Sequence, residues 1–234
     1  MSQDEKLFDE NTWSNEMSFK HDLFAQFARV GKALSNGNRL EILEYLAQTE
    51  RSVDDLAKVS GLSVANTSQH LQQLRQVGLV CSSKRGLKVY YRIAGSDVVN
   101  LLKLLRGVSE RHLADVGQLV NTYLTVKDEL EPVAREDLLD RVKQGLVTVI
   151  DVRPEEEYAA GHVPGAINIP PDELEKRLQG IDSIQEVVAY CRGPHCVFSF
   201  NAVEQLRDKG VDAHRLEDGF PEWKSAGMPV ELSE

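Results

Sequence analysis

Two cysteines five positions apart, Cys191 and Cys196, are the residues of this chain best suited to covalent chemistry. The apolar run at 187–189 predicts a buried strand before them, and the apolar spacing from residue 197 onward predicts a helix after them. A cysteine between a strand and a helix meets free backbone N–H groups and the positive end of the helix dipole. Both lower the pKa of a thiol and attract anions, so we predict that Cys191 is a nucleophile.

The segment that we call the Cys191 loop, residues 191–196, has the sequence Cys-Arg-Gly-Pro-His-Cys. Backbone N–H groups from Arg192 to Val197 would cradle an anionic sulfur donor, and the Arg192 side chain adds positive charge. Cys196 has two interpretations: a small buried residue that lets the loop turn, or a resolving thiol that reacts with Cys191. The predicted catalytic residues are Cys191, Arg192 and Cys196, and the predicted substrate-loop residues are Gly193, Pro194, His195 and Val197.

Two other reactions use a cysteine in an anion-binding loop. Phosphotyrosine-type phosphatases need an arginine six residues after the cysteine to clamp phosphate, and that position is Val197 here. Phosphatase chemistry is therefore disfavoured. Thiol-dependent arsenate reduction also uses paired cysteines, and it stays open.

Charge is divided unevenly along the 234 residues, a length that suits one or two domains. Residues 1–122 hold 15 Lys/Arg and 14 Asp/Glu, a net charge of +1, whereas residues 123–234 hold 12 and 23, a net charge of −11. The segment Leu56–Ser96 contains no acidic residue and six basic ones. Such a basic segment in an acidic protein predicts contact with a phosphate backbone.

The surroundings of the protein can also be predicted. Three cysteines are too few for a disulfide framework, no apolar run is long enough to span a membrane, and the first ten residues are acidic, unlike a signal peptide. We therefore expect a cytoplasmic protein with no membrane partner.

The first half shows the pattern of a winged helix-turn-helix. Ser52 and Ser63 are predicted helix caps, Gly61 the turn between the two helices, and Gly86 the turn of a hairpin with a basic tip. A long helical pattern at 97–124 carries more apolar surface than so small a domain buries, which predicts a homodimer interface. The predicted domains are 1–124, mainly α-helical, and 137–234, with a linker at 125–136.

Strands alternate with helices in the second half, which predicts an α/β domain with a mostly parallel sheet. In such sheets ligands bind at the carboxyl ends of the strands, where Cys191 lies. In the first half, the helix Ser63–Leu74 would enter the major groove of double-stranded operator DNA, and basic residues after it would contact phosphates. The predicted DNA-binding residues are Ser63, Asn66, Ser68, Gln69, Arg75, Lys84, Arg85 and Lys88.

The segments Leu34–Leu43, Ser68–Val80 and Tyr91–Arg92 resemble the ArsR/SmtB family of repressors. The resemblance implies a homodimer on a palindromic operator that is released by an inducer. The inducer sites of that family do not carry over, because the helix after Ser52 lacks a cysteine pair and the 97–124 helix lacks the spacing of metal ligands. No metal site is predicted, and Cys81 is interpreted as a packing residue.

Four segments of the second half resemble a rhodanese domain: Asp151–Tyr158, Gly161–Pro170, the Cys191 loop and Gly219–Trp223. The resemblance implies that Cys191 takes a sulfane sulfur from a donor such as thiosulfate or polysulfide, holds it as a persulfide and passes it to a thiol acceptor. It also implies a buried ion pair of Asp151 and Arg153 as a scaffold beneath the loop. No cofactor is predicted.

Together these features predict a transcriptional regulator, a repressor, whose Cys191 couples sulfane sulfur to operator binding, by persulfidation or by a Cys191–Cys196 bridge. One alternative is a sulfurtransferase whose DNA-binding half only localises or autoregulates it. A second is an arsenic-responsive regulator that uses Cys191 and Cys196.

Overall fold

The computed structural model describes residues 10–125, 130–170, 172–177 and 185–233. The chain folds into two compact units, one comprising Met1–Leu43 with Ser52–Tyr91 and the other Glu44–Arg51 with Arg92–Glu234. This division does not follow the predicted boundary at residue 124, because helix α5 (Ser96–His112) packs with the C-terminal part of the chain. Lys103 and Arg106 on that helix form ion pairs of 2.9 and 3.0 Å with Asp218 and Glu222.

The N-terminal part of the chain has the elements predicted for a winged helix. They are α1 (Glu10–Leu34), α2 (Gly37–Gln48), β1 (Arg51–Ser52), α3 (Val53–Ser60), α4 (Val64–Gln76), β2 (Val80–Arg85) and β3 (Lys88–Ile93). Ser52 and Ser63 cap α3 and α4 by accepting backbone N–H groups, as predicted. Gly61 ends α3 with a left-handed φ of 68°, and Gly86 turns the β2–β3 wing with φ of 60°. The predicted winged helix-turn-helix is thereby confirmed.

The helical pattern at 97–124 is not one continuous helix. It comprises α5 (Ser96–His112), α6 (Ala114–Val120) and a π-helical turn, η1, at Asn121–Thr125. Leu113 separates α5 from α6 because its φ of −106° and ψ of 106° are extended. No glycine or proline stands at the break, and the apolar spacing continues across it. The sequence therefore predicted one uninterrupted helix.

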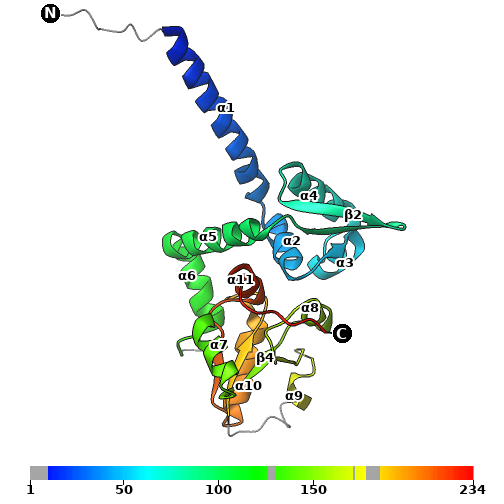
Figure 1. The fold of residues 1–234 in the computed structure, drawn as a ribbon, viewed down its shortest axis with the longest axis vertical. Helices are drawn as coiled ribbons and strands as arrows, with labels where there is room; N and C mark the ends of the chain where they lie inside the picture. Colours follow the sequence, from blue (N-terminus) through cyan, green and yellow to red (C-terminus); the bar gives the residue numbers. More distant parts are fainter. Residues whose placement is uncertain (1–9, 126–129, 171, 178–184, 234) are drawn as a thin grey trace, which may run out of the picture. The chain divides into compact units, whose positions relative to one another are not determined.

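A four-stranded parallel sheet forms the centre of the second unit, as predicted. Its strands lie in the order β5 (Ile167–Asn168), β4 (Val147–Asp151), β6 (Glu186–Tyr190) and β7 (Ala213–Arg215). The helices after η1 are α7 (Arg135–Lys143), α8 (Glu155–Ala159), α9 (Leu174–Arg177), α10 (Val197–Asp208) and α11 (Phe220–Ser225). Helix α7 packs against β4, and α10 packs against β6 and β7 (Figure 1). No helix in the described residues is both apolar enough and long enough to cross a membrane.

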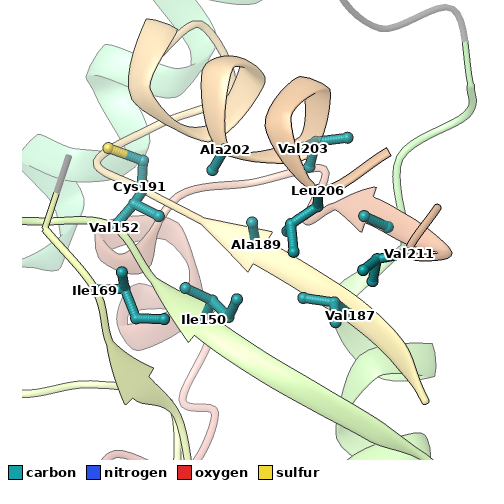
Figure 2. Packing of buried hydrophobic residues seen from close by; sticks show 11 residues of the cluster. Ile150, Val152, Ile169, Val187, Ala189, Cys191, Ala202, Val203, Leu206 and Val211 are labelled. Carbon is teal, nitrogen blue, oxygen red and sulfur yellow. The ribbon is translucent and has the colours of Figure 1, made fainter. Parts of the chain in front are cut away.

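Strand β6 has a separate hydrophobic core on each face, because successive side chains of a strand point to opposite sides. Val187 and Ala189 pack with α10, and Cys191 continues the same row beyond the strand end (Figure 2). Val188 and Tyr190 pack on the other face with Trp223 of α11. The strand period therefore places Cys191 on the α10 side.

The predicted linker at 125–136 is partly folded structure. Its residues 126–129 lie outside the described part of the chain. Val133, however, is buried and forms a parallel bridge with Leu216, its N–H donating to the Arg215 carbonyl at 2.7 Å. Residues 133–136 thus belong to the core edge and to α7 rather than to a linker.

Candidate functional site

Cys191 lies immediately after the carboxyl end of β6 and is 1% exposed. Its carbonyl accepts the N–H of Phe220, the first residue of α11, at 3.1 Å. Gly219 before it is required by close packing, since a Cβ at this position would overlap the backbone between Arg192 and Gly193. The Gly-Phe-Pro-Glu-Trp segment at 219–223 therefore holds the start of the Cys191 loop in place.

Cys196 occupies the N-cap position of α10, so both thiols of the loop lie at the start of that helix. Its N–H donates to the Gly193 carbonyl at 3.2 Å, and its carbonyl accepts both the N–H and the hydroxyl of Ser199. Cys191 and Cys196 are joined by a disulfide, with Cα atoms 6.1 Å apart. The separation lies within the usual range for such a bond.

This geometry leaves fewer N–H groups open to an anion than the sequence predicted. The N–H of Cys196 is already paired with Gly193, so it is not open to an anion in this state. The N–H groups of Val197 and Phe198 begin α10, and the first turn of any helix leaves such donors without a partner within the helix. These donors and the helix dipole favour a thiolate at the loop.

The positive charge of Arg192 is engaged by an acidic residue that sequence reasoning missed. Its guanidinium makes hydrogen bonds of 2.7 and 2.9 Å to Glu157, which is completely buried on α8. Burial disfavours the charge of Arg192, yet the Glu157 carboxylate outweighs burial and raises the pKa of Arg192. Glu157 was missed because Glu155–Glu157 has the sequence of a solvated acidic turn.

Asp151 and Arg153 form a fully buried ion pair at 2.6 Å beneath the loop. Arg153 also donates to the Gly161 carbonyl at 2.7 Å and lies 4.0 Å from the centre of the Phe220 ring. The Tyr190 hydroxyl donates to Asp151 at 2.6 Å. Burial, then the Asp151 charge, raises the pKa of Tyr190 well above its ordinary value, so Tyr190 stays a hydrogen-bond donor.

Two further residues of the Cys191 loop border a cavity of about 360 Å³. Pro194 and His195 line it together with Arg106, Glu110 and Arg215. Burial lowers the pKa of His195; Glu110 at 3.2 Å opposes the shift, while Arg106 and Arg215 add to it. His195 is therefore mainly neutral at pH 7. Val197 lies outside this lining and its side chain is exposed.

The predicted DNA-binding residues lie on α4 and the wing, and most of them are exposed. Ser68 is half-buried, and the hydroxyl of Ser63 is engaged as the cap of α4. Arg85 lies 5.0 Å from the centre of the Tyr90 ring. The exposed positions are Ser63, Asn66, Gln69, Arg75, Lys84, Arg85 and Lys88.

Sequence reasoning overlooked two exposed apolar residues on the same elements. Val64 begins α4 and is 51% exposed, and Leu87 at the wing tip is fully exposed. An aliphatic side chain at the start of a recognition helix can contact a thymine methyl group. A search for apolar residues at the first turn of α4 would have found Val64.

Two family models match this chain. One, for the bacterial regulatory protein, arsR family, matches residues 36–82, and the other, for the rhodanese-like domain, matches residues 134–226. The HTH-type transcriptional regulator Rv0324 of Mycobacterium tuberculosis is 47% identical over 212 residues, which are 91% of this chain and 93% of that protein.

Solved structures resemble each half separately. The homodimeric winged helix-turn-helix DNA-binding domain Mb0332 of Mycobacterium bovis is 47% identical, covering 41% of this chain and 89% of its own, with a TM-score of 0.39. A rhodanese-related protein of Thermoplasma volcanium is 30% identical, covering 44% of this chain and 100% of its own, with a TM-score of 0.40.

Proposed function

The chain belongs to the ArsR family of bacterial regulatory proteins and carries a rhodanese-like domain, and on this premise we propose that it is a repressor controlled by sulfane sulfur at Cys191. As a family member it is a transcriptional regulator. The observation that carries the proposal is the pairing of two thiols, Cys191 and Cys196, at the start of α10. The helix after Ser52, by contrast, contains no thiol.

The first step is the transfer of one sulfur atom to Cys191. The Cys191 thiolate attacks the outer sulfur of a polysulfide or of thiosulfate, and a new S–S bond forms as the old one breaks. The shorter polysulfide, or sulfite, leaves with the electron pair of the broken bond. The dipole of α10 favours the attacking thiolate and the charged donor alike.

The second step gives Cys196 its role as a resolving thiol. The Cys196 thiolate attacks the Sγ atom of the Cys191 persulfide, which forms the Cys191–Cys196 disulfide and releases hydrogen sulfide. The sulfane sulfur is reduced and the two cysteines are oxidised, so electrons balance without another reagent. Their Cα separation of 6.1 Å supports this step, because it lies within the range that a disulfide spans. A thiol acceptor would instead regenerate the Cys191 thiol.

Exposed apolar side chains support a homodimer. The 97–124 region exposes four aliphatic side chains, those of Leu104, Val108, Leu113 and Leu119. Their exposure supports this region as the proposed dimer interface. Helix α1 exposes a second group that sequence reasoning did not assign to an interface: Met17, Phe19, Leu23, Phe24 and Phe27. Apolar side chains gathered in this way are typical of surfaces that a partner covers.

We expect the wing and α4 to contribute differently to DNA binding. Lys84→Ala and Lys88→Ala should weaken binding to all sequences alike and reduce the salt dependence, by about 0.9 in the slope of log affinity against log salt for each phosphate that the protein no longer neutralises. Gln69→Ala should cost about 1–3 kcal/mol on the preferred operator only. Titrations of a duplex at several salt concentrations measure both effects.

Lys143→Ala is the matched control for these lysine variants, because Lys143 is an exposed lysine of α7 in the other unit. Its salt slope should equal that of the unaltered protein. An unchanged slope for both wing variants would remove the wing from the DNA interface.

The function itself is tested by operator affinity before and after polysulfide. The reduced protein selects a duplex from random sequences, and binding to it is then compared for reduced and polysulfide-treated protein, with mass spectrometry of all three cysteines. We expect Cys191 to be loaded, either as its persulfide or as the Cys191–Cys196 disulfide, and the affinity to be at least about fivefold weaker, within the usual range of allosteric coupling.

Two outcomes favour the rival functions. A loaded Cys191 with unchanged affinity, together with turnover of thiosulfate and cyanide, would favour a sulfurtransferase. Release of the duplex by arsenite but not by polysulfide would favour an arsenic-responsive regulator.

A further inference from the structure

A single buried carboxylate joins the Cys191 loop to a distant part of the chain. Glu157 accepts hydrogen bonds from Arg192 in the loop and also from Arg51, whose Nη2 atom lies 2.7 Å from Oε1. Glu157 is completely buried and Arg51 is 5% exposed. The two arginines therefore share one anion, away from solvent, so a displacement of either alters the pairing of the other.

Gln48 makes a second connection to the same loop. Its Nε2 atom donates to the Arg192 carbonyl at 3.2 Å, and its Oε1 atom accepts from Arg153 at 3.3 Å. Gln48 is 3% exposed. One side chain thus contacts both the backbone of the Cys191 loop and the ion pair beneath it.

The sequence positions of Gln48 and Arg51 make these contacts informative. Gln48 is the last residue of α2, and Arg51 directly precedes Ser52, the N-cap of α3. Helix α3 is the first helix of the helix-turn-helix that presents α4. Yet residues Glu44–Arg51 belong to the same compact unit as the Cys191 loop.

We propose that Gln48 and Arg51 are the coupling residues through which the state of the Cys191 loop reaches the helix-turn-helix. This inference rests on the proposed function, since it presumes that Cys191 takes up sulfur. A persulfide or a disulfide at Cys191 changes the conformation of a loop whose next residue is Arg192. The hydrogen bonds that Arg192 makes with Gln48 and Glu157 then change. Arg51, which shares Glu157, transmits the change to the N-terminus of α3.

Reciprocity follows from this linkage. If sulfur on Cys191 weakens operator binding by a given factor, then bound operator must weaken the sulfur-loaded state by the same factor. The change in the loop and the change at the start of α3 belong to one equilibrium, because Glu157 pairs with both Arg192 and Arg51.

The test compares the ratio of operator affinities, reduced over fully loaded protein, in full-length variants. Arg51→Gln and Gln48→Ala should bring this ratio to within about twofold of one, while the unaltered protein keeps its response of at least about fivefold. Arg51→Lys retains the charge opposite Glu157 and should restore part of the ratio. Saturating polysulfide and mass spectrometry ensure that each variant is loaded at Cys191.

Arg141→Gln is the matched control, because Arg141 pairs with Glu186 in the same unit but away from the loop. Its ratio should equal that of the unaltered protein. Unaltered ratios in both Arg51→Gln and Gln48→Ala would overturn the inference.

Hydrogen exchange of the unaltered protein gives a readout that needs neither a variant nor DNA. Loading Cys191 should change amide protection at residues 46–56, and no change there would overturn the inference even if the variants fail to fold. Failure of the proposed function looks different: protection at 46–56 changes on loading, but operator affinity does not.

Discussion

With serine in place of Cys191, the protein should take up no sulfur from polysulfide, and its affinity for operator DNA should be the same before and after treatment. A hydroxyl at this position is not ionised at neutral pH and does not open an S–S bond, whereas the helix dipole of α10 activates a thiol there. Mass spectrometry of the treated protein and titration of a labelled duplex measure the two results.

Cys196→Ser separates the two interpretations of the second cysteine. If Cys196 is a resolving thiol, its loss should leave sulfur uptake intact. The Cys191 persulfide should then accumulate, because no disulfide can form. If Cys196 is only a packing residue, its loss should leave the lifetime of the Cys191 persulfide unchanged. Cys81→Ser is the control for both variants, since Cys81 is a free cysteine on β2, and it should behave like the unaltered protein. Sulfur uptake that persists in Cys191→Ser would place the nucleophile elsewhere.

Asp151→Ala should lower the free energy of unfolding of the C-terminal unit by about 3–5 kcal/mol. The substitution leaves the guanidinium of Arg153 buried without its anion, and it removes the acceptor of the Tyr190 hydroxyl at 2.6 Å. Trp223 is completely buried against the same core, so its fluorescence in a urea titration reports the destabilisation. A Trp13→Phe background removes the signal of the other tryptophan of the chain.

Glu186→Gln is the matched comparison for that measurement. Its carboxylate pairs with Arg141, but both side chains are partly exposed, so the cost should stay below about 1 kcal/mol. Tyr190→Phe removes only one hydrogen bond and should cost about 1 kcal/mol. If Asp151→Ala cost no more than Glu186→Gln, the buried pair would not be the scaffold of the loop.

Features that depend on residues close together in the sequence, such as helix caps, turns and strands, could be predicted from it. The caps Ser52 and Ser63, the turn at Gly61 and the strand before Cys191 follow from residue type and spacing within a few positions, and the structure has each of them. The winged helix and the parallel sheet follow from the order of these elements.

What escaped prediction depends on contacts between distant residues. Glu157 belongs to an acidic run typical of a solvated turn, but it is buried and accepts hydrogen bonds from Arg51 and Arg192, which are 106 and 35 positions away. Gln48 closes a helix in the DNA-binding half, and its partner Arg192 is 144 positions away. The break at Leu113 likewise has no local signal, because the apolar spacing continues across it.

The shared anion at Glu157 also limits how such a gene can be rearranged. A cut near residue 124 would leave Gln48 and Arg51 in one product and Glu157 with Arg192 in the other, so neither product would keep these hydrogen bonds. A recombinant that exchanges the C-terminal part of the chain is therefore expected to keep them only when the segment 44–51 is exchanged with it. These eight residues lie in the first half of the sequence but belong to the compact unit of the Cys191 loop, so we expect them to be inherited together with that loop.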